Sequence, residues 1–306
     1  MPGLMLLDTP SLYYRAFYGV PESVTAPDGT PVNAVRGLLD MIARLVRDRS
    51  PERLVCCMDA DWRPAFRVAA LPSYKAHRVA ETEDRGGTEE TPDPLEAQLP
   101  IIDEVLDAFG LTRLGVAGYE ADDVIGTLAT RTEGPVDIVT GDRDLFQLVD
   151  DRGPVQVLYT ARGIRNLQIM GEKEIADKYA IPGDAYAEFA TLRGDPSDGL
   201  PGVPGVGDKT AAALITRFGS VDGVLAAMDA GETEGFPPGS RARVDRARDY
   251  LAAAGTVVRV VTDIAIPELR DRLPASPPDP GAVARLADRW NLKGPADRLL
   301  AALRDH

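Results

Sequence analysis

The sequence predicts an α/β protein with a mostly parallel sheet covered by helices, followed by a smaller helical region. Short apolar runs end at an aspartate three times, at Asp8, Asp59 and Asp142. Segments with helical spacing of apolar residues lie between these runs, and past about residue 170 the pattern changes to short helices, glycine and proline. Alternating strand and helix patterns are typical of a parallel sheet with helices on its faces.

The first 60 residues contain two predicted strands and the helices between them. Residues 4–7 are an apolar run that stops at Asp8, which indicates a strand buried on both faces. A helical stretch over 11–18 leads to a polar turn, and 33–47 have the one-sided apolar pattern of an amphipathic helix. The second strand, 53–58, stops at Asp59.

A basic segment rich in aromatic residues follows the second strand. Between Asp61 and Glu81 there is no acidic residue, and basic side chains alternate there with rings. Such a segment suits contacts with phosphates and bases, and the alternative is a solvated amphipathic helix. A loop without apolar residues is then expected over 86–94, a helix over 95–109 and a strand over 111–114.

The remaining elements lead into the helical region. A helix opens near Glu120, and a third strand over 136–141 stops at Asp142. Short helices are expected over 172–179, 185–192 and 221–228, and a Pro-rich linker over 274–280 leads to a last helix held by Trp290. Before the helix that ends at Phe218, residues 201–210 contain two Gly-Val steps followed by Lys-Thr. This pattern indicates a helix-hairpin-helix that binds the DNA backbone, the alternative being a simple interhelical turn.

Acidic residues at the strand ends predict a metal site. Ligands of an open parallel sheet bind beyond the carboxyl ends of its strands, so three strands would bring three carboxylates to one edge. Two carboxylates about 5 Å apart repel by roughly 3 kcal/mol, which a divalent cation would offset. Oxygen ligands suit Mg²⁺ or Mn²⁺, and the absence of clustered His or Cys argues against zinc. The alternative is that these acids are solvated surface residues. The candidate ligands are Asp8, Asp59, Glu120, Asp122, Asp123, Asp142, Asp144, Asp195 and Asp198.

Composition limits the class of protein. No apolar stretch of the 306 residues approaches the roughly 20 needed to span a bilayer, and no secretory signal is visible, so we expect a cytoplasmic protein. Adjacent Cys56 and Cys57 in a predicted strand fit a reducing compartment. Only two histidines occur, which disfavours His-based catalysis. The net charge of −14 argues against a nucleic-acid partner, but the uneven distribution of charge favours one.

The order of these motifs resembles the bacterial flap endonuclease and 5′→3′ exonuclease family, which includes the N-terminal nuclease domain of DNA polymerase I. The resemblance runs from Asp8 to about Arg270. Thr9 and Gly199 depart from the glycine and asparagine usual in the family, and neither departure removes a ligand. The motifs are Asp8, Tyr14-Arg15, Phe66-Arg67 to Tyr74-Lys75-Ala76-His77-Arg78, Tyr119 to Asp123, Thr140 to Leu145, and Gly194 to Asp198.

The resemblance implies a PIN-like (resolvase-like) nuclease domain over 1–170, with a helical arch at about 63–93, and a helix-3-turn-helix DNA-binding domain over 171–306. It also implies two or more divalent ions. One would be held mainly by Asp8, Asp59 and Asp122, and the other mainly by Asp142, Asp144 and Asp195. Glu120, Asp123 and Asp198 would bridge the ions or act through water.

Further roles follow from the same resemblance. Lys75 and Arg78 of the arch would contact the scissile phosphate, and Arg15 would contact a phosphate near the first strand. A potassium ion would be held by the backbone carbonyls of Leu192, Arg193, Pro201, Val203 and Val206. The expected DNA contacts are Arg67, Tyr74, Gly205, Val206, Gly207, Asp208, Lys209 and Thr210.

The resemblance implies a monomeric enzyme that hydrolyses DNA at 5′ ends and 5′ flaps, with roles in primer removal and repair, possible action on RNA–DNA primers, and replication or repair proteins as possible partners. Two alternatives stay open. A PIN-like nuclease acting on RNA would share the strand-end acids but would need neither the basic arch nor the Gly-Val hairpin. An inactive protein that binds DNA structures would not need the complete set of acids.

Overall fold

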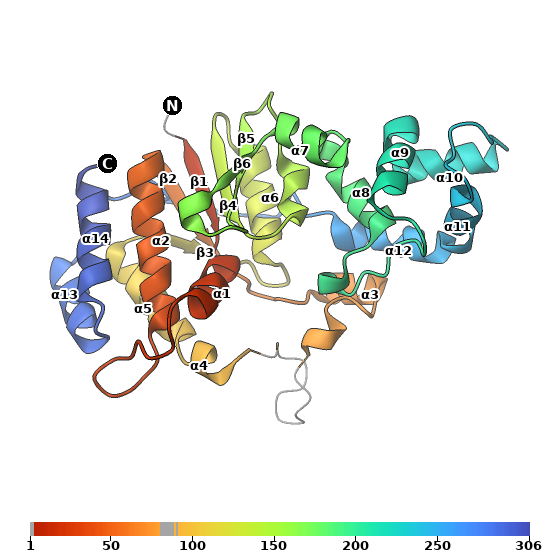
Figure 1. Ribbon diagram of the computed structural model, residues 1–306. Coiled ribbons are helices and arrows are strands. Elements are labelled where there is room, and N and C mark those ends of the chain that lie inside the picture. Colours follow the sequence, from red (N-terminus) through yellow and green to blue (C-terminus); the bar gives the residue numbers. More distant parts are fainter. Residues whose placement is uncertain (1–2, 80–88, 90) are drawn as a thin grey trace.

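The computed structural model describes residues 3–79, 89 and 91–306 and confirms a mostly parallel sheet flanked by helices (Figure 1). Six strands lie in the order β3-β2-β1-β4-β5-β6, and all neighbours are parallel except the antiparallel pair β5 and β6. The strands are β1 (Leu4–Asp8), β2 (Arg53–Cys57), β3 (Thr112–Leu114), β4 (Val136–Thr140), β5 (Val155–Tyr159) and β6 (Gln168–Met170).

The first strand is buried on both faces because its alternate side chains enter two different cores. Leu4 and Leu6 pack into one hydrophobic cluster, and Met5 and Leu7 pack into the other. Since successive side chains of a strand point to opposite faces, one apolar run can serve both cores. This explains why the segment is continuously apolar instead of alternating.

One face of the sheet is covered by helices from both ends of the chain. The chain returns after the helical domain, and its last helices pack beside α2 (Figure 1). The predicted division placed these last helices with the second domain, but they share a core with the first. The helices of this face are α1 (Thr9–Gly19), α2 (Asn33–Arg49), α5 (Leu99–Phe109), α13 (Pro280–Arg289) and α14 (Lys293–Arg304).

The other face packs against the helical domain through one continuous core. Val124 of α6 (Ala121–Arg131), Phe146 of η3 (Asp144–Leu148) and Phe189 of α8 (Tyr186–Arg193) belong to the same hydrophobic cluster. The cluster extends into the helices beyond α8. The remaining elements are α7 (Glu172–Tyr179), η5 (Gly183–Ala185), η6 (Pro196–Asp198), α9 (Asp208–Phe218), α10 (Val221–Asp229), α11 (Ser240–Arg246) and α12 (Arg248–Val258).

The structure differs from the sequence expectations in two places that affect the site. The helix expected over 95–109 is divided into α4 (Asp93–Glu96) and α5, because Pro100 lies in the first turn of α5 and cannot continue a helix from its N-terminal side. The described part of the predicted arch contains the short α3 (Ala65–Ala70) and η1 (Ala76–Arg78), whereas residues 80–88 and 90 lie outside the described residues.

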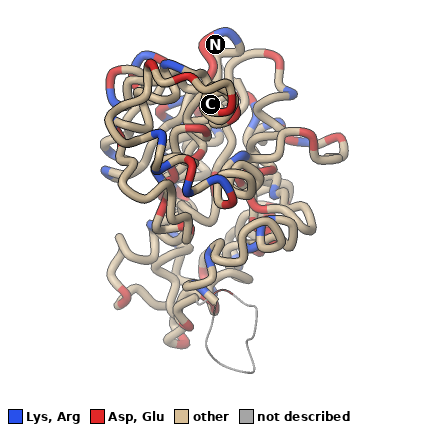
Figure 2. Tube along the Cα trace, turned by 90° about the vertical axis from the view of Figure 1, so that its right-hand side faces the viewer, with Lys and Arg blue, Asp and Glu red and all other residues tan. Residues whose placement is uncertain are grey.

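The distribution of charge and the hydropathy of the helices single out no region of the fold. Acidic and basic residues are interspersed along the chain trace, so the net charge of −14 is not confined to one region (Figure 2). No single helix in the described part of the chain is long and apolar enough to cross a bilayer. Helices α9 and α10 meet that test only as a pair, bent by 72° where they join.

Candidate active site

Strands β1, β2 and β4 end at the same edge of the sheet, and the aspartates that follow them line one cavity of about 230 Å³. Asp8 is the last residue of β1, while Asp59 and Asp142 each lie two residues beyond their strands. Asp122 reaches the cavity from the first turn of α6. The fold therefore brings five of the nine predicted metal ligands to this cavity, because Glu120 lines it as well.

Local hydrogen bonds orient these carboxylates. Asp8 caps α1, its Oδ1 accepting from Ser11 N at 3.2 Å, and its Oδ2 accepts from Thr140 Oγ1 at 2.5 Å. The same Thr140 hydroxyl accepts from Asp142 N at 2.8 Å, so it connects the ends of β1 and β4. Asp59 Oδ1 accepts from Ala121 N at 2.7 Å, which ties the end of β2 to the start of α6.

Burial and mutual repulsion disfavour the charged forms of these acids. The pKa of Asp8 is raised to about 7, mainly by burial and partly by the carboxylates of Asp59 and Asp142, while the hydrogen bond from Thr140 opposes the rise. The pKa of Asp122 is also raised well above its usual range, first by burial and then by Asp8 and Asp142. A bound cation would favour the charged forms, so this clustering suits a metal site.

A second group of acids lies beside the first. The pKa of Asp144 is raised by burial and by the nearby carboxylates of Asp142, Asp198 and Asp195, which places these groups together. Asp195 caps η6 by accepting from Ser197 N at 2.9 Å, and its other oxygen lies 3.4 Å from Arg143 and 3.5 Å from Arg193. These acids therefore lie next to the strand-end cavity.

The donor set fits hard divalent cations. Asp144 Oδ1 is buried and has no hydrogen-bond partner, which leaves a carboxylate oxygen available for an ion. All donors are oxygens, as Mg²⁺ and Mn²⁺ prefer. Among residues 3–79, 89 and 91–306, no three acidic, histidine or cysteine side chains converge closely enough to make a ready-formed ion cage. The structure thus gathers the ligands around a cavity without closing them on one point.

Arg67 requires a correction, because it is only 2% exposed and cannot reach DNA. Its Nη1 donates to Glu120 at 2.6 Å and to Asp123 at 2.7 Å, and its Nη2 donates to Asp123 at 2.6 Å. Asp123 is fully buried and also accepts from the backbone of Val261 at 2.8 Å. These three side chains, which we call the Arg67 triad, also remove Asp123 from the set of metal ligands.

Glu120 lies between the triad and the cavity. Its Oε2 accepts from Tyr74 OH at 2.7 Å, and its Oε1 pairs with Lys75 Nζ. Tyr74 is 3% exposed and therefore supports Glu120, so the predicted direct contact of Tyr74 with DNA is also corrected. Burial raises the pKa of Glu120 to about 7, although Lys75 and Arg67 oppose the rise. Glu120 still lines the cavity, so it retains a possible role beside an ion.

The predicted catalytic cations lie around the cavity. Lys75 and Arg78 line it, and Arg78 Nη2 donates to Asp198 Oδ1 at 3.1 Å. Arg15 lies beside Gly141, where a Cβ would lie 3.4 Å from its Nη2 and 2.9 Å from Ser11 Oγ. Arg15 lines a larger neighbouring cavity and not the strand-end cavity. Two of the three predicted cations therefore line the carboxylate cavity directly.

Residues 73–75, at the base of the predicted arch, contact the loop that contains Asp195 and Asp198. Lys75 N donates to Asp198 O at 3.0 Å, and Ser73 Oγ donates to Gly199 O at 3.1 Å. A Cβ at Gly199 would lie 2.3 Å from Ser73 O, and Gly199 has a positive φ of 71°. Glycine at this position thus permits the close contact of the two segments, which accounts for the departure noted in the sequence.

The predicted hairpin has an apolar inside and an exposed polar end. Val203 and Val206 are buried, and Val206 N donates to Val203 O at 2.9 Å. Gly207 precedes α9, whose first turn exposes Asp208 and Lys209. Free amides at this helix start can face a phosphate. Residues 205 and 207–209 of the hairpin are thus exposed, Thr210 is partly buried, and the predicted DNA contact of Val206 is corrected because this side chain is buried in the core.

The five predicted potassium carbonyls belong to two segments that touch. Val203 N donates to Leu192 O at 2.9 Å, and a Cβ at Gly202 would lie 2.4 Å from Arg193 O. The end of α8 and the loop through Pro201 are therefore in backbone contact. This contact brings the predicted carbonyls into one region of the helical domain.

Two residues of the site were not predicted from the sequence. Thr140 connects Asp8 and Asp142. The signal for its role was its position at the end of the third apolar run, directly before Gly141 and Asp142. Glu89 lines the cavity from the arch, and burial raises its pKa. No spacing in the sequence connects Glu89 with the strand ends.

Comparisons with known proteins give a consistent result. A family model described as 5′-3′ exonuclease, N-terminal resolvase-like domain, matches residues 3–180, and one described as 5′-3′ exonuclease, C-terminal SAM fold, matches residues 181–281. The chain is 58% identical over 300 residues to the 5′-3′ exonuclease of Streptomyces coelicolor, covering 98% of this chain and 99% of that protein. It is 39% identical over 308 residues to the DNA polymerase I of Mycobacterium tuberculosis, covering 99% of this chain and 32% of the polymerase.

Solved structures share the fold at low sequence identity. The T5 5′-exonuclease with bound zinc has a TM-score of 0.63 and 16% identity, with 99% of this chain and 98% of that chain covered. Flap endonuclease-1 from Methanococcus jannaschii has a TM-score of 0.59 and 14% identity, with 99% and 93% covered. The resolvase-like fold with a helical C-terminal domain therefore extends over nearly the whole chain.

Proposed function

Because the chain belongs to the 5′-3′ exonuclease family, we propose that it cuts DNA phosphodiesters at 5′ ends and 5′ flaps at the carboxylate cavity described above. Membership of the family confirms the predicted class, a 5′→3′ exonuclease, and metal dependence and flap cleavage are part of what we propose. The observation that carries the proposal is the meeting of Asp8, Asp59, Asp122 and Asp142 in one cavity that Lys75 and Arg78 also line.

The acids would hold two divalent ions, which in such sites activate water and neutralise charge on the leaving oxygen. We propose that Asp8, Asp59 and Asp122 hold mainly one of them and that Asp142, Asp144 and Asp195 hold mainly the other, with Asp198 acting beside the second ion. We propose Mg²⁺ or Mn²⁺, since every donor is an oxygen. Glu120 would act beside the first ion, since it lines the cavity.

The cations of the arch would act on the phosphate itself. Lys75 and Arg78 line the same cavity as the acids, so they can offset the negative charge that develops on the transferring phosphate. In the described structure both are paired with carboxylates, Lys75 with Glu120 and Arg78 with Asp198. Ions bound to those acids would leave the two cations free to turn to the substrate.

The helical domain would hold the duplex. Gly205, Gly207, Asp208, Lys209 and Thr210 form the exposed end of the hairpin, where amides and Lys209 can contact phosphates without reading sequence. We propose that potassium binds the carbonyls of the adjoining segments and orders this end. The proposal includes action as a monomer in the cytoplasm on DNA with 5′ flaps or 5′ ends, including RNA–DNA primers, in replication and repair.

Product mapping on a labelled 5′-flap duplex tests the function. We expect cleavage near the flap junction with Mg²⁺ or Mn²⁺, none after chelation, and recovery when the ion is returned. A single-stranded RNA of the same sequence should be cut much more slowly. Equal or faster cleavage of the RNA would favour an RNA nuclease of similar fold, and no cleavage of either substrate with Mn²⁺ would favour a DNA-structure-binding protein without activity.

A further inference from the structure

Trp62 lines the carboxylate cavity and has no role in the function proposed above. It follows Asp59 by three residues, in the loop that leads from β2 to the base of the predicted arch. The side chain is half-buried, so part of the indole stays open to a ligand. An aromatic side chain that borders a cavity of acids and cations is suited to contact a substrate there.

Three aromatic side chains occur in the segment between Asp61 and Glu81 that contains no acid, and the protein engages two of them itself. The ring of Phe66 packs against Tyr119, with ring centroids 6.0 Å apart. The ring of Tyr74 is buried. None of the ring pairs in the described part of the chain includes Trp62, so its aromatic face is available for stacking with a base.

Hydrogen bonds on both sides of Trp62 fix the loop that contains it. Asp61 N donates to Tyr119 O at 3.2 Å, just before the start of α6. Arg63 Nε donates to Tyr74 O at 2.6 Å, which ties the loop to the base of the arch. An indole held in this way loses little conformational freedom when a ligand binds, and this lowers the cost of binding.

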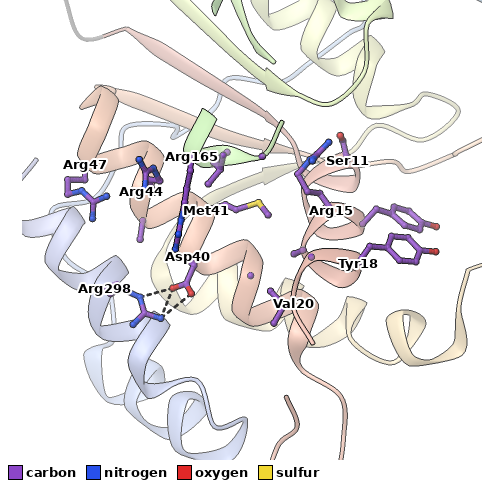
Figure 3. Close-up of a pocket in the computed structure, with 17 residues that line it drawn as sticks. Ser11, Arg15, Tyr18, Val20, Asp40, Met41, Arg44, Arg47, Arg165 and Arg298 are labelled. Carbon is purple, nitrogen blue, oxygen red and sulfur yellow. Dashed lines mark hydrogen bonds and ion pairs between the residues drawn. The ribbon is translucent and has the colours of Figure 1, made fainter. Parts of the chain in front are cut away.

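Trp62 lies beside the acids and not in the larger cavity next to them. That larger cavity has a volume of about 1060 Å³, and Figure 3 shows Arg15 and Tyr18 on the same helix at one side of it. Ser11 and Tyr14 line both cavities, so α1 is a wall that the two share. Of these two cavities Trp62 lines only the smaller one, where the acids meet.

The size of the carboxylate cavity suits an unpaired nucleotide better than a base pair. Its volume of about 230 Å³ is below the roughly 300–1,000 Å³ of most small-molecule pockets. A strand that reaches the acids is therefore unpaired at the cut, and its base has lost part of the stacking of a duplex. An aromatic ring in the same cavity can replace one of those stacking contacts.

The cation that would meet the phosphate is a neighbour of the loop that carries the indole. Lys75 lines the cavity, and its Nζ donates to Trp62 O at 3.5 Å. The phosphate and the base of one nucleotide are separated by a single sugar. A nucleotide whose phosphate lies between the acids and Lys75 therefore has its base within reach of the indole.

We propose that Trp62 is a specificity-determining residue that stacks on the base of one of the two nucleotides flanking the scissile phosphate. This role rests on the proposed function and adds a base contact to a site otherwise made of metal and phosphate contacts. Every base has a π-face, and a purine has the larger one. Trp62 therefore favours cuts beside a purine without reading the sequence through hydrogen bonds.

The first test measures single-turnover cleavage of a 5′-flap duplex with Mg²⁺, and of two versions with an abasic sugar at either nucleotide flanking the cut. One base–aromatic stack corresponds to about five- to a hundredfold in an equilibrium constant. Trp62→Ala should therefore cut the intact flap about tenfold or more slowly than the wild type. On one of the abasic flaps the two proteins should differ by less than about twofold, because no base remains to stack. Trp62→Phe, which retains a ring, should cut the intact flap at an intermediate rate.

The second test uses the fluorescence of the indole itself. The chain contains two tryptophans, and Trp290 is 8% exposed in the core beside α13. Trp290→Phe is the matched control for loss of an indole and should cut like the wild type, and in it Trp62 is the single tryptophan. Binding of the intact flap in Ca²⁺, which also takes oxygen ligands, should quench the Trp62 emission. The abasic flap on which Trp62→Ala cuts normally should leave that emission unchanged.

A purely structural role of Trp62 predicts a different result. Trp62→Ala would then lose the same factor on the intact flap and on both abasic flaps, and this outcome would overturn the inference, as would emission that the intact flap does not change. Trp62→Leu, which keeps much of the volume without a π-face, replaces the alanine variant if circular dichroism shows that the latter does not fold. Failure of the wild type to cut any flap would count against the proposed function, whereas cleavage that does not depend on Trp62 would count against this inference alone.

Discussion

Replacement of Arg67 by methionine should destabilise the protein strongly while leaving its DNA-binding surfaces intact. The side chains of the Arg67 triad are 2%, 4% and 0% exposed for Arg67, Glu120 and Asp123, so the two carboxylates cannot recover solvation when the guanidinium is removed. Arg67 also donates to the carbonyl of Val257 at 3.1 Å, at the end of α12. The substitution therefore also loosens the contact of the arch base with the helical domain.

The magnitude follows from the burial of the triad. Removing one partner of a buried ion pair typically costs about 3–5 kcal/mol, because the remaining charge is left uncompensated. For a protein of this size that cost corresponds to a decrease of the melting temperature on the order of 5–10 °C. Arg67→Met/Asp123→Asn should recover part of the loss, since one of the two uncompensated charges is then removed. The loss in Arg67→Met should also become smaller at acidic pH, where protonated carboxyls no longer need a cation.

The assay is urea unfolding followed by circular dichroism, with anisotropy of a labelled flap below the melting transition. We expect the large loss of stability together with near wild-type affinity for DNA. Destabilisation below about 1 kcal/mol, the value typical of a solvent-exposed pair, would refute the reasoning about burial. A large loss of DNA affinity in a fully folded variant would restore the direct contact that the structure excludes.

Three further outcomes are expected. Asp142→Asn should abolish cleavage with Mg²⁺, measured by product mapping, and should largely retain flap binding, measured by anisotropy. Wild-type turnover by this variant would contradict the role of Asp142 as a metal ligand. The pKa of Asp8 is raised from 3.8 to about 7, so its contribution to stability is present below about pH 4 and is lost as the pH rises through 7. In EDTA the melting temperature should therefore fall over this pH range, and Mn²⁺ should raise the melting temperature more at pH 8 than at pH 5. Equal increases at both pH values would exclude ionised carboxylates as the ligands. Gly202→Ala should lower the free energy of urea unfolding by about 1–3 kcal/mol and weaken DNA binding, because φ of Gly202 is +65° and the new Cβ would lie 2.4 Å from Arg193 O. Gly207→Ala is the control and should unfold like the wild type, because no atom lies within 4 Å of the new Cβ.

The strand ends were predictable from the sequence because a strand buried on both faces is continuously apolar. The aspartates that stop such runs must then lie at one edge of a parallel sheet. Asp8, Asp59 and Asp142 were located in this way, and Asp122 followed from the start of a helix. Strands β5 and β6 were missed, and β6 has only three residues, too few to show a period.

The functions of individual charged residues could not be assigned from the sequence. Arg67 and Arg78 occur in the same basic segment, yet one is buried in the Arg67 triad and the other lines the cavity. Only the packing of α3 on α12 decides between these roles, and contacts between residues separated by nearly 200 positions leave no local pattern. The same limit applies to Arg298, which reaches α2 from the other end of the chain.

The continuous core that joins the sheet to the helical domain has a consequence for where cuts fall. Val124, Phe146 and Phe189 are packed in one cluster, so the hairpin and the acids are attached to a common rigid frame and not to modules joined by a hinge. The distance between the DNA-binding hairpin and the acids that cut the strand is therefore fixed. A flap enzyme built in this way should cut at a fixed distance from the junction, whatever the length of the tail it removes.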